Sequence, residues 1–171
     1  LNTGSDSEVL LNVVAHELHN AIGNEKLRAE PEDLFKAVSS VYSRCRGAFS
    51  VVVMIVGYGI LAFRDGYGIR PLILGRRDVK GEPSVMIASE SVALDVLGYE
   101  VDVDIKPGEA VFIDLARKIH KKQCCVKPVL APCLFEYVYL ARPDSTIDNV
   151  AVYKSRLRMG EKLGNKLLRE W

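Results

Sequence analysis

Hydrophobic positions in the first 45 residues recur at helical spacing in two stretches. Ser5 is followed three residues later by Glu8, a capping-box signature that places a helix start before the apolar positions Val9, Leu10, Val13, Val14 and Leu18. The first helix is therefore expected from about Asp6 to Asn20. A second is expected to begin at Pro31-Glu32-Asp33 and to end before Gly47, with one apolar face made of Leu34, Phe35, Val38 and Val41.

The middle of the chain consists of short apolar runs separated by glycine, proline and charged residues, which is the pattern of β-strands. A short helix at Glu90–Leu97, ended by Gly98, interrupts the series. A further, weaker strand is expected at Arg117–Lys121. The main strands are predicted at Phe49–Val56, Ile60–Arg64, Leu72–Gly75, Val85–Ser89, Val101–Asp104 and Ala110–Asp114.

The pattern dissolves between Lys122 and Pro132, which makes this stretch the best candidate for a domain exit. The run FEYVYLARPDS (Phe135–Ser145) then passes from aromatic and apolar residues into a proline-containing turn. From residue types alone, it is predicted to be a buried segment that turns a corner between two packed units. Residues from Asn149 to Trp171 keep helical spacing and predict a long final helix.

Composition adds limits on partners. The 171 residues carry a net charge of +1 with mixed signs, so charge favours neither nucleic acid nor a membrane surface as partner. The longest uncharged run, Ala48–Phe63, is shorter than the roughly 20 residues that a membrane span needs. The four cysteines show no C-x-x-C spacing and are expected to be reduced thiols of a cytoplasmic protein, namely Cys45, Cys124, Cys125 and Cys133.

Several side chains have both a structural and a chemical interpretation. Asp6 either complements the dipole of a helix that Ser5 caps, or receives the ammonium group of a ligand. Arg64 and Asp65 are expected to form an ion pair that clamps the following glycine-containing loop.

Other candidates for chemistry have simpler explanations. His16 and His19 could form a metal pair, but without a third ligand nearby they are better explained as a solvated helix face. Cys45, between two arginines, is either a thiol of lowered pKa or a helix-end cysteine in the core.

Five blocks together resemble a known family. FEYVYLARPDS closely resembles the segment that leaves the glutaminase domain in amidophosphoribosyltransferases. NTGSDSE (Asn2–Glu8) is similar to a segment of class II glutamine amidotransferases, the superfamily that contains them. The blocks FRDGYGIRPLILGRR (Phe63–Arg77), ASESVAL (Ala88–Leu94) and PGE (Pro107–Glu109) occur there in the same order and mainly shape the glutaminase fold, although many relatives have proline in place of Gly66.

The resemblance implies roles for three residues. Asp6 matches the aspartate that holds the α-amino group of glutamine. Tyr139 matches a tyrosine that couples the two active sites and lines the ammonia path; the alternative is a core aromatic with one hydrogen-bond partner. Cys133 stands three residues before Glu136, where some relatives have an iron–sulfur ligand, but the surrounding sequence is closer to relatives without a cluster.

The resemblance also implies an activity and a domain plan. Such enzymes hydrolyse glutamine and pass ammonia to 5-phosphoribosyl diphosphate with Mg²⁺ assistance, giving phosphoribosylamine and diphosphate in the first committed step of purine synthesis. The expected fold is α+β, with N-terminal-nucleophile hydrolase-like stacked antiparallel sheets flanked by helices, then a crossover and a long helix. The expected parts are the C-terminal part of the glutaminase domain (1–121), the crossover (122–148) and the first helix of the transferase domain (149–171).

The catalytic residues of this family are expected outside the chain. The nucleophile is an N-terminal cysteine, and an asparagine and a glycine near it form the oxyanion hole; all three are expected upstream of Leu1. The 171 residues alone are therefore expected to be inactive, and the parent enzyme is expected to be a homo-oligomer. The alternatives are another class II amidotransferase, such as an asparagine synthetase, and a non-catalytic binding or scaffold module with the same fold.

Overall fold

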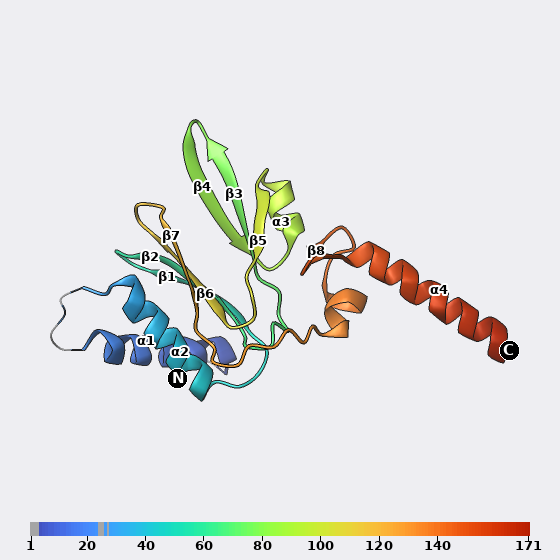
Figure 1. Ribbon diagram of the computed structural model, residues 1–171, viewed down its shortest axis with the longest axis horizontal. Helices are drawn as coiled ribbons and strands as arrows, with labels where there is room; N and C mark the ends of the chain where they lie inside the picture. The colour runs from blue at the N-terminus through green and yellow to red at the C-terminus, as the bar shows by residue number, and fades with distance from the viewer. Residues whose placement is uncertain (1–3, 24–25, 27) are drawn as a thin grey trace. The chain divides into compact units, whose positions relative to one another are not determined.

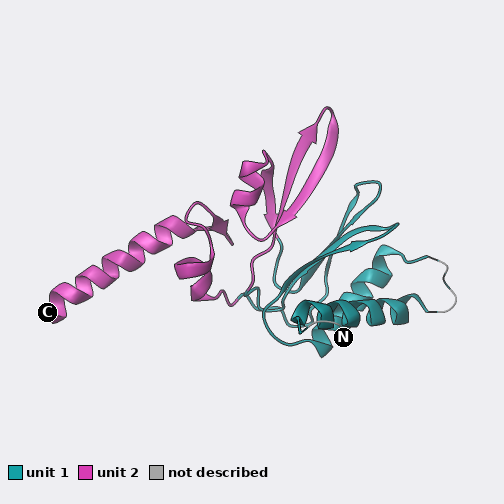
Figure 2. Ribbon diagram, turned by 180° about the vertical axis from the view of Figure 1, so that it is seen from behind, with its two compact units in different colours: residues 1–69, 105–130 teal, residues 70–104, 131–171 magenta. Residues whose placement is uncertain are grey.

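The computed structural model describes residues 4–23, 26 and 28–171, so Asn2 and Thr3 of the NTGSDSE block lie outside it. The chain divides into two compact units, each assembled from two separate stretches (Figure 2). Unit 1 comprises residues 1–69 and 105–130, and unit 2 comprises residues 70–104 and 131–171.

Unit 1 begins with the two predicted helices, α1 (Asp6–Ile22) and α2 (Pro31–Arg44), which are confirmed to within about a turn. At the start of α1, the Ser5 hydroxyl accepts a hydrogen bond from the Ser7 amide at 3.3 Å. At the start of α2, Glu30 and Asp33 form a reciprocal capping box, and Pro31 is the first residue of the helix. Sequence-local caps therefore determine where both helices begin.

The helices of unit 1 pack on an antiparallel sheet (Figure 1). Its order is β1 (Ser50–Ile55), β2 (Gly59–Arg64), β6 (Glu109–Asp114) and β7 (Ile119–Gln123). Strand β7 starts two residues later than predicted, because Arg117 has a φ of 63° in the turn after β6. The core between helices and sheet includes Leu34, Phe35, Val38, Val41, Leu61, Phe63 and Phe112.

Unit 2 contains a second antiparallel sheet of order β4-β3-β5, formed by β3 (Ile73–Val79), β4 (Glu82–Ala88) and β5 (Glu100–Asp104). The short helix α3 (Ser91–Val96) lies within its predicted range. The β3–β4 hairpin is longer than predicted because Val79 pairs with Glu82 across a two-residue turn. Lys80 and Gly81 have φ values of 57° and 84°, as the tight hairpin turns of type I′ require.

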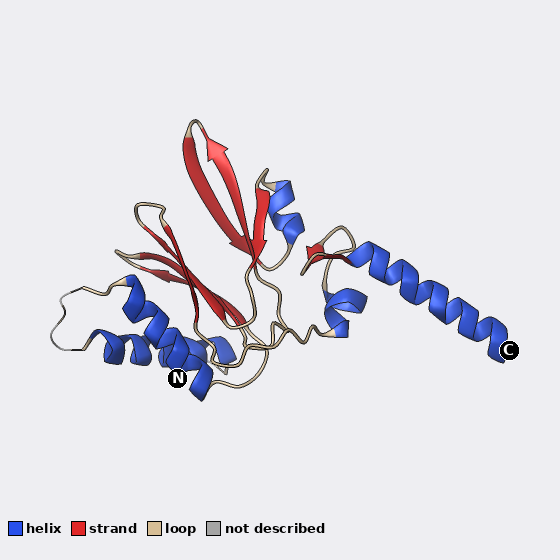
Figure 3. Cartoon of the chain, viewed as in Figure 1, coloured by secondary structure: helices blue, strands red, loops and turns tan. Residues whose placement is uncertain are grey.

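The rest of unit 2 contains a π-helix and a small hairpin that the sequence pattern did not predict, followed by the predicted final helix. A one-turn π-helix, η1 (Glu136–Leu140), precedes a small hairpin of β8 (Thr146–Ile147) and β9 (Val150–Ala151). The final helix, α4 (Val152–Glu170), is the long helix that leads to the C-terminus (Figure 3). It begins three residues later than predicted because Asp148 and Asn149, which have positive φ values, form the hairpin turn. Antiparallel sheets with helices confirm the α+β class.

A close backbone approach in unit 1 gives a stability prediction. Gly108 has a φ of 70°, and an added Cβ would lie 2.2 Å from the Cys125 Cβ. Gly108→Ala should therefore lower the free energy of unfolding by about 3 kcal/mol, from backbone strain and overpacking together. Urea unfolding of the chain, followed by circular dichroism, measures the loss.

Gly81→Ala is the matched control, since Gly81 also has positive φ but has no atom within 4 Å of an added Cβ. That variant should show only the backbone strain, about 1 kcal/mol. Equal losses in the two variants would show that the close approach at Gly108 has no energetic cost.

Candidate functional site

Three of the family-like sequence blocks meet inside unit 2. Arg70 comes from the loop before β3, Glu90 and Ser91 come from the start of α3, and the FEYVYLARPDS run follows far along the chain. We call the contacting residues of these blocks, together with an arginine of the last helix, the crossover junction. Its members are Arg70, Glu90, Ser91, Glu136, Tyr137, Arg142, Ser145 and Arg156.

Glu90 holds the proline turn of the crossover. Its Oε2 atom accepts a hydrogen bond from the Arg142 amide at 2.8 Å and another from the Ser145 hydroxyl at 2.7 Å. The neighbouring Ser91 hydroxyl accepts from the Thr146 amide at 2.9 Å. Hydrogen bonds to a carboxylate are roughly twice as strong as neutral ones, so the start of α3 fixes this turn.

The turn also carries an ion pair of its own. The Arg142 guanidinium donates to both carboxylate oxygens of Asp144, at 3.0 and 2.9 Å. This hydrogen bonding holds the pKa of the Asp144 carboxyl below its ordinary value. Both side chains are exposed, so the pair defines the shape of the turn more than it adds stability.

An ion pair marks the beginning of η1. The Glu136 side chain is only 6% exposed and accepts a hydrogen bond from Arg70 Nη1 at 2.5 Å. A carboxylate so deeply buried is tolerated only when it is paired and hydrogen-bonded. The contact ties the N-terminal end of η1 to the residues that lead into β3.

Helix α4 contacts η1 near both of its ends. Arg156 Nε donates to the Tyr137 carbonyl and Arg156 Nη2 to the Ala141 carbonyl, each at 2.7 Å. Tyr137, Ala141, Ile147 and Val152 form a small buried cluster beneath these contacts. The crossover is therefore fixed by both charged contacts and apolar packing.

Tyr139 lies on the outer side of η1, with 78% of its surface exposed. The run Phe135–Ser145, predicted to be a buried segment, is buried only in part: Glu136 and Tyr137 are buried, whereas Val138, Tyr139 and Leu140 are exposed in these 171 residues. Both interpretations of Tyr139, the coupling role and the core aromatic, stay predictions.

Asp6 is exposed in the first turn of α1. Ser5 supplies the cap, and the Asp6 carboxylate accepts a long hydrogen bond of 3.5 Å from the Ser7 hydroxyl. This arrangement fits both interpretations of Asp6, interaction with the helix dipole and binding of a ligand ammonium group. Asp6 belongs to unit 1 and Tyr139 to unit 2.

Arg64 and Asp65 are both buried and contact the backbone of the loop that follows β2. The expected ion pair between them stays a prediction. Arg64 donates to the Ile105 and Gly68 carbonyls, each at 2.8 Å. Asp65 Oδ1 accepts from the Tyr67 amide at 2.9 Å and the Ile69 amide at 3.2 Å. Because these contacts run to backbone groups, the two residues shape the loop and are not displayed to a ligand.

The histidines and cysteines supply no metal site in the described part of the chain, where no group of three metal-binding side chains is found. His16 is hydrogen-bonded to Asn20 on the exposed face of α1, which fits a solvated helix face. Cys45 ends α2 and packs on the core, which favours its structural interpretation. Burial raises the pKa of the Cys124 thiol to about 11, and all four cysteines are free thiols.

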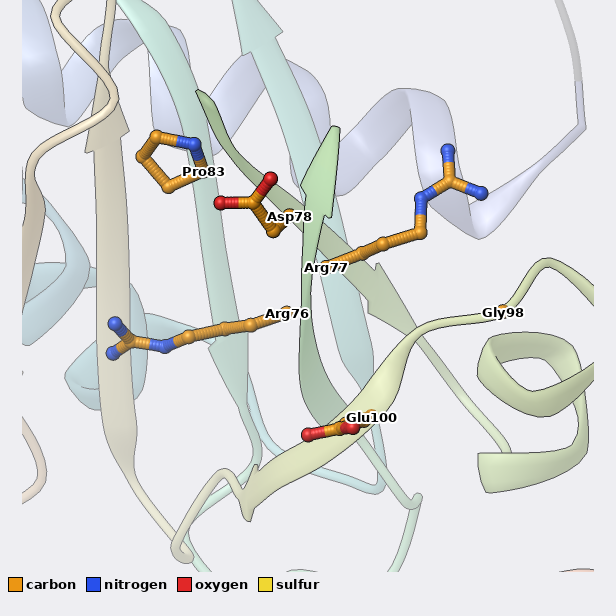
Figure 4. A pocket seen from close by; sticks show the side chains of 6 residues that line it. All are labelled: Arg76, Arg77, Asp78, Pro83, Gly98 and Glu100. Carbon is orange, nitrogen blue, oxygen red and sulfur yellow. The ribbon is translucent and has the colours of Figure 1, made fainter. Parts of the chain in front are cut away.

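A shallow hollow of about 470 Å³ lies on the β3–β4–β5 sheet, lined by Arg76, Arg77, Asp78, Pro83, Gly98 and Glu100 (Figure 4). The two arginines extend in opposite directions from β3. Arg76 Nε forms an ion pair with Asp102 Oδ2 at 2.8 Å. The Arg77 guanidinium lies over the Tyr99 ring, with its Cζ atom 4.6 Å from the ring centroid. Their charges are thus engaged within the sheet and do not converge on an anion site.

Among the described helices, none has the length and apolar character needed to cross a membrane.

Comparisons with known proteins find no matching family model. Curated relatives named amidophosphoribosyltransferase match the whole chain. The protein of Pseudomonas aeruginosa is 57% identical over 170 residues, covering 99% of this chain and 33% of the relative. The protein of Escherichia coli is 49% identical, covering 100% of this chain and 34% of the relative. The protein of Saccharomyces cerevisiae is 43% identical, covering 99% of this chain and 34% of the relative. The chain thus spans about one third of the length of these relatives.

Two solved structures share the fold. One is a glutamine phosphoribosylpyrophosphate amidotransferase from B. subtilis, complexed with ADP and GMP, with a TM-score of 0.71 and 26% identity over 91% of this chain and 30% of that one. The other is an allosteric regulatory enzyme of purine biosynthesis, with a TM-score of 0.76 and 26% identity over 97% of this chain and 32% of that one.

Proposed function

We infer from this whole-chain match that the 171 residues are one segment of an amidophosphoribosyltransferase, and we propose that the protein containing them has that enzyme's activity. The observation that carries the proposal is the identity of 57% along 99% of the chain. The crossover junction supports it, because the sequence blocks typical of the family contact one another there.

The proposed reaction has two half-reactions. Glutamine is hydrolysed to glutamate, and the ammonia released attacks 5-phosphoribosyl diphosphate to give phosphoribosylamine and diphosphate. The N-terminal cysteine, the oxyanion-hole residues and the Mg²⁺ site of this proposal lie outside the 171 residues. The resemblance further supports a cytoplasmic homo-oligomer.

The finer account of the fold belongs to the same proposal. The helices and sheets would form part of an N-terminal-nucleophile hydrolase-like glutaminase domain (1–121), joined by the crossover (122–148) to the first transferase helix (149–171). The residues of this chain would bind glutamine through Asp6, couple the sites through Tyr139 and carry the connection between the domains.

Complementation tests the proposal. A bacterial strain that lacks amidophosphoribosyltransferase requires purines, and the full-length gene containing this chain should restore growth without them. An asparagine synthetase would instead restore growth of an asparagine-requiring strain, and a scaffold module would restore neither. Failure to relieve the purine requirement, with the protein expressed and soluble, would contradict the proposed function.

The role of Asp6 gives a specific kinetic prediction. Asp6→Asn keeps the side chain's shape but removes the charge that would pair with the ammonium group of glutamine. Loss of one charged hydrogen bond should raise the glutamine KM of the full-length enzyme by roughly ten-fold or more. Ammonia-dependent synthesis of phosphoribosylamine should be unaffected, because it bypasses glutamine.

Glu8→Gln is the control, since Glu8 is also an acidic residue of the first turn of α1. It should leave the KM within about two-fold. If Asp6→Asn behaves in the same way as Glu8→Gln, Asp6 interacts only with the helix dipole.

A further inference from the structure

The π-helix η1 ends after a single turn, where residues of two other elements contact its backbone. In a π-helix, each amide donates to the carbonyl five residues earlier. The Ala141 amide makes such a bond to the Glu136 carbonyl at 2.9 Å. The next bond in the series would join the Arg142 amide to the Tyr137 carbonyl.

Charged side chains from two other elements occupy both of those groups. Glu90, at the start of α3, accepts the hydrogen bond of the Arg142 amide at 2.8 Å. Arg156, from α4, donates to the Tyr137 carbonyl at 2.7 Å. The next donor and acceptor of the series are thus each bonded to a residue distant in sequence. Pro143 also disfavours helical backbone at Arg142, the residue that precedes it.

Arg156 also reaches the C-terminal end of the turn. Its Nη2 atom donates to the Ala141 carbonyl at 2.7 Å, so one guanidinium binds carbonyls four residues apart. A guanidinium is suited to this because its donors are held in one plane at fixed spacing. Tyr139 is the residue midway between the two carbonyls.

Arg156 itself is held in place by the first turn of α4. The Val152 amide donates to the Ser145 carbonyl and the Tyr153 amide to the Pro143 carbonyl, both at 3.0 Å. The Val152 side chain is fully buried. The start of α4, the proline turn and η1 are thus joined by hydrogen bonds on several sides.

We propose that Arg156 is a positioning residue: it holds η1 so that the exposed Tyr139 keeps one orientation, and it transmits the position of α4 to that tyrosine. The proposal rests on the proposed function, in which Tyr139 couples glutamine hydrolysis to phosphoribosyl transfer. Glu90 acts on the same turn by holding the Arg142 amide.

The test uses the full-length protein with three substitutions. Arg156→Gln removes the two-carbonyl contact, Arg156→Lys keeps the charge without the fork, and Arg158→Gln is a control on the exposed face of α4. Two quantities are measured: glutamate formed per phosphoribosylamine with glutamine, and phosphoribosylamine synthesis with ammonia. Arg156→Gln should raise the first at least about two-fold and change the second by less than about two-fold. Arg156→Lys should be intermediate, and Arg158→Gln should match the wild type.

Two outcomes would overturn the proposal. One is a glutamate ratio in Arg156→Gln equal to that of Arg158→Gln. The other is loss of ammonia-dependent synthesis in both Arg156 variants, which would make Arg156 merely structural.

Hydrogen exchange separates failure of this proposal from failure of the proposed function. If the wild-type protein forms no phosphoribosylamine from glutamine, the proposed function fails, and exchange at residues 141 and 142 then decides the positioning role. Faster exchange there in Arg156→Gln than in Arg158→Gln supports it. Equal exchange in the two variants overturns it.

Discussion

Replacing Asp65 by alanine should lower the free energy of unfolding by about 3–5 kcal/mol. The carboxylate is fully buried and accepts hydrogen bonds from the Tyr67 and Ile69 amides, and from the Phe49 amide at 3.3 Å. Alanine would leave these three donors without this acceptor. Equilibrium urea unfolding of the chain, followed by circular dichroism, measures the loss.

Two variants accompany this measurement. Asp65→Asn keeps one oxygen acceptor and should show an intermediate loss. Asp95→Ala removes an exposed carboxylate of α3 and should change the free energy by less than about 0.5 kcal/mol. A loss below about 1 kcal/mol in Asp65→Ala would show that the loop does not depend on the carboxylate.

Tyr139→Phe should uncouple the two half-reactions of the full-length enzyme while leaving its fold intact. Because Tyr139 is 78% exposed, removal of its hydroxyl should change the free energy of unfolding by less than about 0.5 kcal/mol. Glutamine hydrolysis should respond less to 5-phosphoribosyl diphosphate, and more glutamine should be consumed per phosphoribosylamine formed. Ammonia-dependent synthesis should stay near normal. The measurement is the ratio of glutamate to phosphoribosylamine at saturating substrates.

Tyr153→Phe is the matched control, because Tyr153 is another exposed tyrosine of unit 2, on α4. It should keep the wild-type ratio. If Tyr139→Phe also keeps tight one-to-one coupling, Tyr139 has no part in signalling between the sites, and the crossover serves only to connect the domains.

The sequence predicted those elements whose positions depend on local signals. Helices α1 and α2 begin at side-chain caps and have an apolar face at helical spacing, so pattern and structure agree. Hairpin β3–β4 was predicted too short because its outer half carries exposed charged residues, Arg76, Arg77 and Asp78. Backbone pairing holds that part together, and hydrophobic pattern does not report backbone pairing.

The π-helix could not be predicted, because five residues contain no period that separates a π-turn from an α-turn. The contacts that Glu90 and Arg156 make at η1 join residues that are distant in sequence. From the sequence alone, an arginine such as Arg156 in a helix rich in charged residues is expected to be a solvated surface charge. The resemblance assigned the block containing Glu90 to shaping the fold, and the hydrogen bonds of Glu90 agree with that.

Some residues of the candidate site could be nominated from the sequence, whereas those that contact one another only in the fold could not. Asp6 and Tyr139 were nominated through sequence resemblance, and each could also be explained by local structure. Both are exposed in these 171 residues, and both alternatives stay open for each of them. Arg70 and Glu136 were not nominated as a pair, because 66 positions separate them and only the fold brings them together.

The dependence of glutamine hydrolysis on 5-phosphoribosyl diphosphate tests the central claim most directly. The full-length protein is incubated with glutamine and Mg²⁺, with and without 5-phosphoribosyl diphosphate, and glutamate and diphosphate are measured. The account predicts that hydrolysis rises strongly with 5-phosphoribosyl diphosphate and that one diphosphate is released per glutamate. Glutamine hydrolysis that is indifferent to 5-phosphoribosyl diphosphate, with no diphosphate released, would contradict it.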